Sequence, residues 1–579
     1  MNVIMNIKNK NSPKLPYGNA NFRKIRTKNN YAYVDKTQFI EMLEEENNSS
    51  QIFIRPRRFG KSLFLSMLAY YYDVNFSDEF EQLFGGLYIG QNPTPYKNSY
   101  AVMEFDFSGM DTSNTDNFRN SFLDNIKFTV RQFLQRHKNL FPKAKQFIEQ
   151  LDREQSTLSI LSTAFSIADD SRIKIFVIID EYDHFANDLI AMGTIMGDDF
   201  YKKMITVNGL VRDFYEKLKI ASKYGIVDRT FITGISPVML DDLTSGYNIA
   251  TNYSLKLQYN EMLGFTRDEV TKLMNVTGID RNQIEVDMEY YYNGYQFHED
   301  AVNKVYNSTM ILYFFEQILE NNKPPKNFID PNLSIDSSRF KRLVKNDRNR
   351  EIIVEIIKNG NIVSNVLEKF SIEQLDTDSY FISLLFYMGL LTMKKTSNEL
   401  QLVIPNYSIQ TIYWNCLRDF VRDHSPEIML NVSVLEDAIS AMATEGDIRC
   451  FIDYVSKNAF SKLSDFDLQR FDEKYIKALL FAYLLLSNLY IPMSEYEAVP
   501  GRADIFLQRN PNVPQVNYEW VLELKYCKTD AKPTEINQKR KEGLEKLKQY
   551  INSFRLKDRP NLKSALIIFI GKDQYEIVM

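Results

Sequence analysis

Five short apolar runs, separated by longer stretches with helical spacing, lie within the first 257 residues. Each run is rich in β-branched or aromatic residues, and most show little polar alternation. That is typical of strands buried on both faces of a parallel sheet. The pattern predicts an α/β doubly wound domain. The predicted strands are Gln51–Ile54, Ala101–Phe107, Ile173–Asp180, Thr230–Thr233 and Tyr253–Leu257.

The rest of the chain has a different pattern. Residues 258–450 are mostly helical, with a helix at Phe381–Met393 that leads to a hairpin strand at Leu400–Ile404. Residues 451–579 predict the order helix, strand, strand, helix, strand. We therefore predict three domains, at residues 1–257, 258–450 and 451–579. The C-terminal elements are Lys474–Leu489, Ala503–Leu507, Trp520–Leu524, Thr534–Phe554 and Ser564–Ile570.

Composition excludes several classes of protein. Three cysteines and four histidines are too few for a disulfide framework, a Cys-rich zinc site or a His-based metal cluster. The longest apolar stretch, Ala478–Met493, falls short of the roughly 20 residues of a membrane helix and is predicted to be a buried helix. The N-terminus lacks the apolar core of a signal peptide. We expect a cytoplasmic protein without membrane contact. Its net charge of −5 argues against indiscriminate nucleic-acid binding but permits a local basic groove.

The segment 55-RPRRFGKS-62 follows the first predicted strand and opens a helix. It resembles the P-loop (Walker A) pattern G-x-x-x-x-G-K-[ST], with Arg55 in place of the first glycine. Backbone amides could approach phosphate at Gly60, Lys61 would supply a positive charge, and Ser62 could ligate Mg²⁺. The alternative is an Arg-Pro turn that caps a helix. The candidate contacts to ATP are Arg57, Arg58, Phe59, Gly60, Lys61, Ser62 and Leu63.

A second segment, 174-KIFVIIDEYD-183, has the pattern of a Walker B strand. Asp180 would hold Mg²⁺ and Glu181 would polarise the attacking water. The alternative is a surface loop with acidic caps. Thr233, at the end of the next strand, is either a sensor of the γ-phosphate or a structural strand-end residue. Three arginines, Arg57, Arg58 and Arg229, either contact phosphate, reach a neighbouring subunit of a homo-oligomer, or are solvated.

Two C-terminal segments, 501-GRADIFLQ-508 and 521-VLELKY-526, predict a carboxylate pair with a lysine. Glu523 and Lys525 lie two apart on one strand and therefore point to the same face, and a hairpin can bring Asp504 beside them. The two carboxylates could bind one or two Mg²⁺ ions that activate water, and Lys525 could orient the nucleophile or neutralise charge. An E-x-K on a strand is otherwise a solvated face.

The chain resembles the family of AAA-ATPase-like proteins whose genes are abundant in anaerobic bacteria. The resemblance rests on many short motifs in one order: 33-YVDKT-37, 55-RPRRFGKS-62, 179-IDEYD-183, 233-TGISP-237, 264-GFTRDEV-270, 294-GYQF-297, 305-VYNS-308, 384-LLFYMGLLT-392 and 501-GRADI-505. It implies a P-loop NTPase parallel sheet, a helical middle region and a C-terminal restriction-endonuclease-like α/β domain of the PD-(D/E)XK nuclease superfamily. It also implies that Arg55 is a family trait.

The resemblance assigns two more positions in the C-terminal domain. An upstream helix contributes a carboxylate that matches Glu495, with Glu497 as a substitute. Relatives carry Gln in an A-x-x-Q-L-x-x-Y context on the helix after E-x-K, and here that position is Lys546. Residues 523–563 hold 12 Lys or Arg and 6 Asp or Glu. This excess is either a phosphate-binding patch or an ordinary solvated helix.

Two functional hypotheses follow. In the first, the protein binds ATP, with hydrolysis or binding alone both open, and couples it to an Mg²⁺-dependent nuclease domain acting on nucleic acid. That architecture is compatible with genome defence or mobile-element biology. In the second, it is a nucleotide-switched binding protein whose C-terminal domain holds nucleic acid or protein without cleavage.

Overall fold

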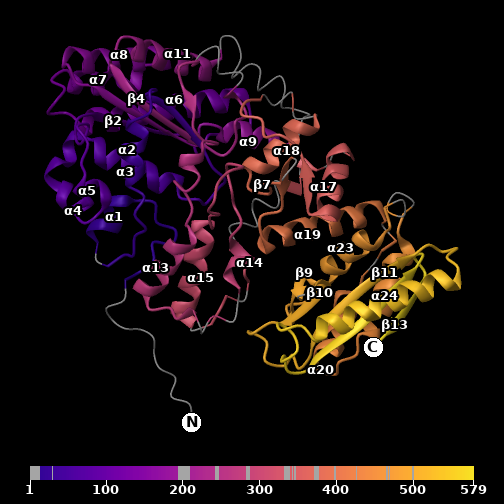
Figure 1. Cartoon of the computed structure of the whole chain (residues 1–579). Helices are drawn as coiled ribbons and strands as arrows, with labels where there is room; N and C mark the ends of the chain where they lie inside the picture. Colours follow the sequence, from indigo (N-terminus) through magenta and orange to yellow (C-terminus); the bar gives the residue numbers. More distant parts are fainter. Residues whose placement is uncertain are drawn as a thin grey trace. The chain divides into compact units, whose positions relative to one another are not determined.

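The computed structural model describes two compact units of the chain (Figure 1). Unit 1 comprises residues 1–349 and 363–405, and unit 2 comprises residues 350–362 and 406–579. The structure separates into these two compact units. The division into three domains, at residues 1–257, 258–450 and 451–579, stays a prediction. The described residues are 13–28, 30–192, 209–240 and 247–579, the last without 282–283, 285–286, 322, 326, 331–339, 342, 345–346, 371–373, 375–376, 397–398, 426, 429, 465–466, 468–469 and 499–500.

Unit 1 is built on a parallel five-stranded sheet in the order β2-β3-β4-β1-β5. Its central strands are buried almost throughout, as their continuous apolar sequences predict. Strands β1 and β3 both end at the carboxyl edge of the parallel sheet, where loops lead into the following helices. The strands are β1 (Ser50–Ile54), β2 (Ala101–Asp106), β3 (Ile175–Asp180), β4 (Val227–Gly234) and β5 (Thr251–Asn252).

Helices cover both faces of this sheet. Figure 1 shows α8 and α11 on one side and α2 and α3 on the other. Aromatic pairs hold helices against the two faces of the sheet. The ring centroids of Tyr72 in α3 and Phe176 in β3 lie 4.8 Å apart, and those of Phe214 in α11 and Phe105 in β2 lie 5.0 Å apart. The helices are α2 (Gln38–Glu44), α3 (Lys61–Tyr72), α6 (Thr115–Arg136), α8 (Thr157–Asp170), α9 (His184–Met192) and α11 (Leu210–Lys223).

The fifth strand lies earlier in the sequence than predicted. Residues 253–257 are not a strand; β5 is Thr251–Asn252, and a 3-10 helix begins at Leu257. The reason lies in Tyr253 and Tyr259. Both rings are buried, and they pack edge to face with centroids 5.8 Å apart, so these apolar residues form the core of a turn.

The middle segment of unit 1 is helical and ends in a hairpin. Its predicted helix near Phe381 is α18 (Asp378–Tyr387), and the predicted hairpin consists of β7 (Thr392–Lys395) and β8 (Leu400–Val403), paired antiparallel. The other helices of the segment are α13 (Arg267–Thr277), α14 (Met288–Tyr292) and α15 (Ser308–Asn321).

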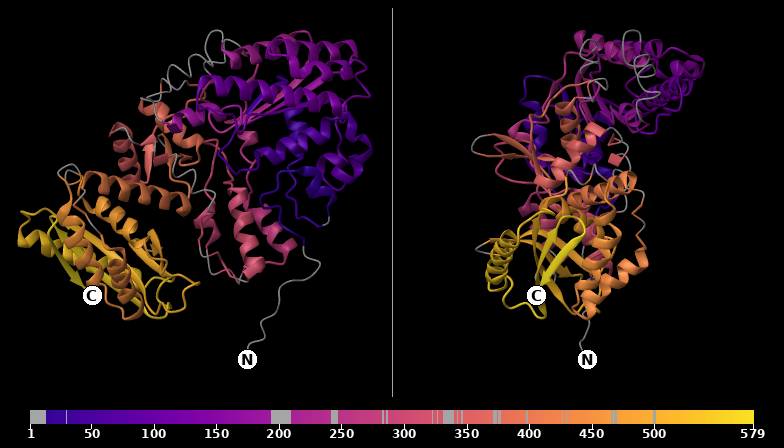
Figure 2. Two further views of the ribbon diagram at one scale, coloured as in Figure 1. Left: turned by 180° about the vertical axis from the view of Figure 1, so that it is seen from behind. Right: turned by 90° about the vertical axis from the view of Figure 1, so that its right-hand side faces the viewer.

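Unit 2 carries a mixed sheet in the order β13-β12-β11-β10-β9. Strands β9, β10 and β11 pair antiparallel, and β11 and β12 pair parallel. Helix α24 lies along one face of this sheet (Figure 2), where Leu566 fills the space beside Gly543. The elements are α17 (Asp347–Asn359), α19 (Tyr407–His424), α20 (Val432–Thr444), α21 (Arg449–Asn458), α23 (Glu473–Leu484), β9 (Tyr490–Ala498), β10 (Gly501–Arg509), β11 (Glu519–Cys527), α24 (Pro533–Ile551), β12 (Leu562–Ile570) and β13 (Gln574–Val578).

The apolar stretch Ala478–Met493 is not one helix. Helix α23 ends at Leu484 and strand β9 begins at Tyr490. Pro492 has no amide hydrogen for a helix, and Ser487 and Asn488 supply the turn between the two elements. The C-terminal order therefore contains two strands, β9 and β13, that the sequence pattern did not predict.

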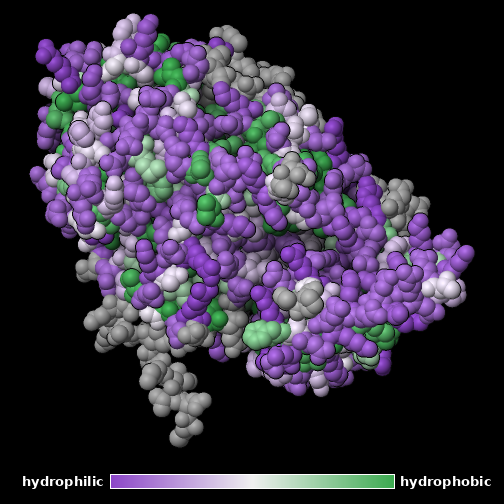
Figure 3. All heavy atoms as spheres, viewed as in Figure 1, coloured by the Kyte–Doolittle hydropathy of each residue, from purple (hydrophilic) through white to green (hydrophobic). Residues whose placement is uncertain are grey.

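No helix in the described part of the chain is long and apolar enough to cross a membrane. On the face drawn in Figure 3, hydrophobic residues are scattered among a hydrophilic majority. Such scattered surface hydrophobic residues are normal for a globular protein and need no partner to explain them.

Candidate nucleotide and metal sites

The loop between β1 and α3 has a backbone that suits anion binding. Gly60, the N-cap of α3, has a φ of 97°, and Arg58 has a φ of 68°. The value at Gly60 lies in the left-handed region that glycine adopts at least cost. Helix α3 starts at Lys61 and leaves the amides of its first turn without intrahelical partners, so they can face a phosphate.

Lys61 is held inside this loop. Its buried Nζ donates hydrogen bonds to the carbonyl oxygens of Arg55 (2.9 Å) and Pro56 (3.1 Å). Burial lowers the pKa of Lys61, and the nearby charges of Glu181 and Asp180 partly offset that effect. An added negative group at the loop would favour the charged lysine, as a phosphate site requires.

Ser62 and Asp180 lie together, as the Walker motifs predict. The Ser62 hydroxyl donates to Asp180 Oδ2 at 2.7 Å, across the gap between α3 and the end of β3. Burial raises the pKa of Asp180 to about 6 although the Ser62 hydrogen bond and Lys61 act against the shift. A serine hydroxyl beside a carboxylate is a donor set that fits Mg²⁺.

Glu181 has a different environment from its neighbour. Burial would raise the pKa of Glu181, but the nearby His184 and the charges of Lys61 and Arg57 lower it to about 2. The His184 Nδ1 atom lies 3.9 Å from Glu181 Oε2, and the His184 pKa is raised, chiefly by this partner. Sequence reasoning missed His184, although its position three residues after Glu181 at the start of α9 was a usable signal.

Arg55 is a structural residue of the loop. Only 1% of it is exposed, and its guanidinium donates to the carbonyl oxygens of Ile54 (3.0 Å), Ser254 (2.6 Å) and Tyr259 (2.8 Å). The guanidinium carbon also lies 4.0 Å from the ring centroid of Phe297. The residue that replaces the first glycine therefore fixes the loop to the segment after the sheet.

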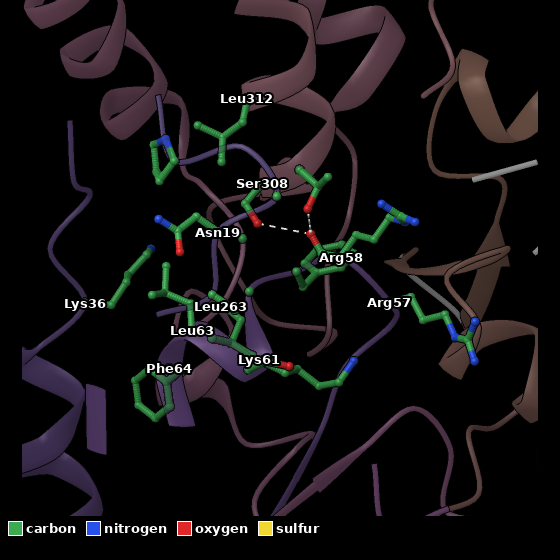
Figure 4. Close-up of a pocket in the computed structure, with 18 of the residues that line it drawn as sticks. Asn19, Lys36, Arg57, Arg58, Lys61, Leu63, Phe64, Leu263, Ser308 and Leu312 are labelled. Atoms are coloured by element: carbon green, nitrogen blue, oxygen red, sulfur yellow. Dashed lines mark hydrogen bonds between the residues drawn. The ribbon is translucent and has the colours of Figure 1, made fainter. Parts of the chain in front are cut away.

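The middle segment supports the loop from behind. The Phe59 carbonyl accepts a hydrogen bond from the Gly264 amide at 3.1 Å. The Arg58 carbonyl accepts from the hydroxyl groups of Ser308 (3.1 Å) and Thr309 (2.9 Å), as Figure 4 shows. The Phe59 ring packs 4.9 Å from Tyr295. Motifs far apart in the sequence thus converge on the same loop.

A cavity of about 610 Å³ opens along this loop. Figure 4 shows Arg57 and the Lys61 amine toward one side, and Asn19, Lys36 and Leu263 on the other. The volume lies within the range of roughly 300–1,000 Å³ common to ligand sites. One group of lining residues is polar (Lys61, Ser62, Asp106, Asp180, Glu181 and His184), and another is mainly apolar (Ala32, Val34, Leu63, Met262, Leu263, Phe265 and Leu312).

Three further residues of the prediction have contacts of their own, and of these three Arg58 lines the cavity. The Thr233 hydroxyl is buried and donates to the Phe53 carbonyl at 2.6 Å, and Thr233 is not among the residues that line this cavity. Arg58 forms an ion pair of 3.6 Å with the buried Asp330. Arg229 lies over the Tyr96 ring at 4.4 Å.

The C-terminal carboxylate pair comes together on neighbouring strands. Asp504 of β10 immediately precedes Ile505, which pairs with Leu522 of β11, and its Oδ2 accepts a hydrogen bond from the Leu524 amide at 2.9 Å. Burial and the charge of Glu523 raise the pKa of Asp504 to about 6. Lys525 Nζ donates to Glu523 Oε1 at 2.8 Å. The predicted Asp504, Glu523 and Lys525 therefore form one cluster.

Glu523 supplies the test of whether a cation fits here. The residue is fully buried, and its Oε2 atom has no hydrogen-bond partner among the described residues. A buried carboxylate oxygen without a partner is costly unless a cation binds it. Among the residues described, no group of three or more His, Cys, Asp or Glu could hold a metal ion, so the carboxylates that this cluster offers to a cation are those of Asp504 and Glu523.

Glu495 lies on a strand, not on the upstream helix. It is part of β9, has a φ of 52°, and forms an ion pair with Lys477 of α23. The helix instead contributes Glu473, whose carboxylate lies 3.6 Å from Lys525 Nζ. No sequence pattern points to Glu473, because its place beside the cluster depends on how the first turn of α23 packs.

Lys546 joins the cluster from α24. Its Nζ donates to Glu523 Oε1 at 3.0 Å, so two ammonium groups share that oxygen. Burial would lower the pKa of Lys546, but the hydrogen bond and charge of Glu523 raise it. Position 546, which the family resemblance associates with glutamine, therefore carries a charged partner of Glu523.

Comparison with known proteins matches two parts of the chain to family models. Residues 16–244 match a family model described as "Predicted AAA-ATPase", and residues 471–577 match the PD-(D/E)XK nuclease superfamily. An uncharacterized protein in the vnfD 5′ region of Azotobacter chroococcum mcd 1 is 26% identical over 306 residues, which is 52% of this chain and 52% of that relative. The match thus spans about half the length of that relative.

Two solved structures show weaker likeness. The Walker-type ATPase PABY2304 of Pyrococcus abyssi is 13% identical with a TM-score of 0.36, over 65% of this chain and 94% of that one. The ORC2 protein of Aeropyrum pernix, solved in ADPNP-ADP complexes, is 12% identical with a TM-score of 0.32, over 69% and 98%. The matched parts of the chain are therefore an AAA-ATPase-like region at residues 16–244 and a PD-(D/E)XK nuclease-superfamily region at residues 471–577.

Proposed function

We propose that this protein binds and hydrolyses ATP in unit 1 and cuts nucleic acid with Mg²⁺ in unit 2, with the nucleotide state controlling the nuclease. The observation that carries the first part is the cavity of about 610 Å³ with Lys61, Ser62, Asp180 and Glu181 in its lining. Its polar residues suit phosphates and its apolar residues suit a base. ATP supplies both.

In hydrolysis, Asp180 and Glu181 would have different roles. Ser62 and Asp180 would hold Mg²⁺, which would neutralise phosphate charge. Glu181 remains a carboxylate at neutral pH because its pKa is about 2. The Glu181 carboxylate can therefore orient a water molecule by accepting a hydrogen bond from it. The water oxygen bonds to the γ-phosphorus, the bond to the bridging oxygen breaks, ADP leaves with that oxygen, and the water proton passes to solvent.

The nuclease proposal rests on the buried, unpartnered Oε2 of Glu523 beside Asp504. Mg²⁺ bound by these two carboxylates would act as a Lewis acid and lower the pKa of a water molecule. Lys525 lies within hydrogen-bond distance of Glu523 and would orient the nucleophile. Water attacks phosphorus, the bond to the leaving sugar oxygen breaks, and that oxygen takes up a proton.

The second hypothesis, binding without cleavage, has one observation in its favour. Two ammonium groups share Glu523 Oε1, which weakens the attraction of this carboxylate for a cation. In that case the domain would hold nucleic acid or protein and release it according to the nucleotide state. A homo-oligomer is compatible with both hypotheses.

The nucleotide proposal is tested by calorimetric titration of ATP and Mg²⁺ into the full chain. Lys61→Ala should abolish measurable binding, because it removes the positive charge of the loop. Lys145→Ala, an exposed lysine on another helix of unit 1, is the matched control and should bind ATP as the wild type does. Unchanged binding by Lys61→Ala would contradict the proposal.

The nuclease proposal is tested on linear, circular and single-stranded DNA and on RNA, with Mg²⁺, with and without ATP. We expect cleavage that Asp504→Ala abolishes and that the exposed control Asp530→Ala retains. A dependence on ATP that disappears in Lys61→Ala would demonstrate coupling. Binding of ATP with no cleavage of any substrate would favour the nucleotide-switched binding protein.

A further inference from the structure

Two lysines from different elements meet at one oxygen of Glu523. Lys525 Nζ of β11 lies 2.8 Å from Glu523 Oε1, and Lys546 Nζ of α24 lies 3.0 Å from it. Lys525 is the lysine of the E-x-K segment. Lys546 lies outside that segment, on α24. The site therefore contains one more positive charge than the E-x-K segment alone supplies.

The remaining acceptors of the cluster suit one divalent ion. Glu523 Oε2 is buried and has no partner among the described residues. Asp504 uses Oδ2 to accept from the Leu524 amide and has one further carboxylate oxygen. Two-metal sites hold their ions about 3.5–4 Å apart and need carboxylate oxygens for both. Glu523 Oε1, which could serve a second ion, is shared by the two ammonium groups.

The side chain of Lys546 is also accessible. It is 50% exposed, whereas its partner Glu523 is fully buried. Its ammonium group therefore lies at the border between the carboxylate cluster and solvent, where a phosphate of an incoming strand would have to arrive. A lysine is a compact point charge with three donors and can contact a carboxylate and a phosphate together.

We propose that Lys546 is a catalytic residue that supplies the second positive charge of this site, so that the site takes one Mg²⁺ instead of two. The inference rests on the proposed nuclease function. Lys546 contacts a non-bridging phosphate oxygen and stabilises the negative charge that grows there as the water oxygen bonds to phosphorus. The bond to the leaving sugar oxygen breaks, and that oxygen takes its proton from solvent.

The test counts Mn²⁺ ions by electron paramagnetic resonance, on the full chain without nucleotide. The number bound at this site is the number lost in Asp504→Ala. We expect one ion for the wild type, two for Lys546→Gln and one for Lys546→Arg, which keeps the charge. Lys548→Gln, an exposed lysine on the same helix, is the matched control and should keep one. Thermal unfolding checks that each variant is folded.

The outcomes separate this inference from the nuclease function. Two ions in the wild type, or one ion in a folded Lys546→Gln, overturns the role of Lys546 even where cleavage depends on Asp504. No ion that depends on Asp504 overturns both proposals. One ion with no cleavage of any substrate overturns the nuclease function and, with it, the catalytic role. One ion in the wild type, two in Lys546→Gln and Asp504-dependent cleavage support both.

Discussion

At the residue scale, both sites hold an aspartate in surroundings that oppose its charge. Burial raises the pKa of Asp180 and of Asp504 to about 6. The ordinary value for aspartate is about 3.9. The folded protein therefore binds protons more tightly at these positions than the unfolded chain does. Without a cation, each charged aspartate lowers the free energy of unfolding.

Asp504→Asn should therefore stabilise the metal-free protein at pH 8, by about 1–2 kcal/mol. The destabilisation by Asp504 is absent below about pH 4, grows as the pH rises toward the folded pKa, and is complete above it. The difference between variant and wild type should thus disappear at pH 4. Thermal unfolding in chelator measures it. Mg²⁺ should raise the unfolding temperature of the wild type more than that of Asp504→Asn; an equal rise would contradict the metal assignment.

Glu181→Gln should separate ATP binding from hydrolysis. The amide keeps the size of the side chain but cannot accept a hydrogen bond from water as a carboxylate does, so kcat should fall by about 10²–10⁴-fold. The dissociation constant for ATP should stay within a few-fold of the wild type. Phosphate release and calorimetry measure the two quantities. Glu149→Gln, an exposed glutamate of unit 1, should leave both unchanged. A retained kcat in Glu181→Gln would argue against its role.

Individual residues differed in how far the sequence could predict them. Lys61, Ser62 and Asp180 could be placed because the P-loop and the acid strand fix their positions locally. The interaction of His184 with Glu181 could have been inferred from helical spacing. Glu473 could not, because its approach to Lys525 depends on the packing of α23 against the sheet.

At the element scale, the loop between β1 and α3 is shaped by segments outside the sheet. The Gly264 amide bonds to the Phe59 carbonyl, and a Cβ atom at Gly264 would lie 2.8 Å from the Tyr306 carbonyl oxygen. Gly264 also has a φ of 85°. The position therefore excludes any side chain for two independent reasons.

Gly264→Ala should lower both stability and ATP affinity. Backbone strain and the clash together should cost about 3 kcal/mol, because the Tyr306 carbonyl cannot move freely. Gly278→Ala is the matched control: its φ is 77°, but a Cβ there meets nothing within 4 Å. It should cost about 1 kcal/mol and leave ATP affinity unchanged. Urea unfolding and calorimetry measure the pair, and equal effects of the two changes would contradict the support of the loop by Gly264.

Arg55→Gly, which restores the common P-loop glycine, should destabilise unit 1 by about 3 kcal/mol. The change removes three hydrogen bonds and a cation–π contact and leaves a cavity. Arg55→Lys should also destabilise, because an ammonium group cannot reproduce the planar set of donors. Thermal unfolding checks both. A stable Arg55→Gly variant would mean that the guanidinium does not fix the loop.

Elements were predictable where local pattern determines them. Strands β1 to β4 were found because each is a short apolar run before a turn or helix. Strand β9 was missed because periodicity cannot distinguish a buried helix from a buried strand within one apolar stretch. The loop support by Gly264, Tyr295 and Ser308 could not be derived from spacing, since it joins segments more than 200 residues apart.

At the scale of the whole molecule, the boundary of unit 2 lies inside a helix. Residues Arg350–Ile362 belong to unit 2 although unit 1 resumes after them. Within unit 2, Glu351 pairs with Arg470 at 3.0 Å and Asn359 bonds to Lys474 at 3.0 Å. Lys358 pairs with Asp472 at 2.5 Å. Helix α17 is therefore part of the body that carries the nuclease-like sheet.

A fragment of residues 406–579 should be less stable than one in which residues 347–362 are joined to residues 406–579 by a short Gly-Ser linker. The shorter fragment lacks α17 and exposes the apolar surface that covers Ile353 and Ile356, both fully buried in the complete chain. It should unfold at lower temperature or aggregate. Thermal scans and light scattering of the two fragments at equal concentration measure this. Equal stability would mean that α17 is dispensable for unit 2.

The path of the chain also bears on how such a protein can evolve. The chain passes between the two units three times, after residues 349, 362 and 405. A gene fusion joins its parents at a single point, so no one breakpoint could exchange unit 2 for another domain and leave both units intact. Selection would then act on the two units together, and substitutions in one unit would always be inherited with those in the other.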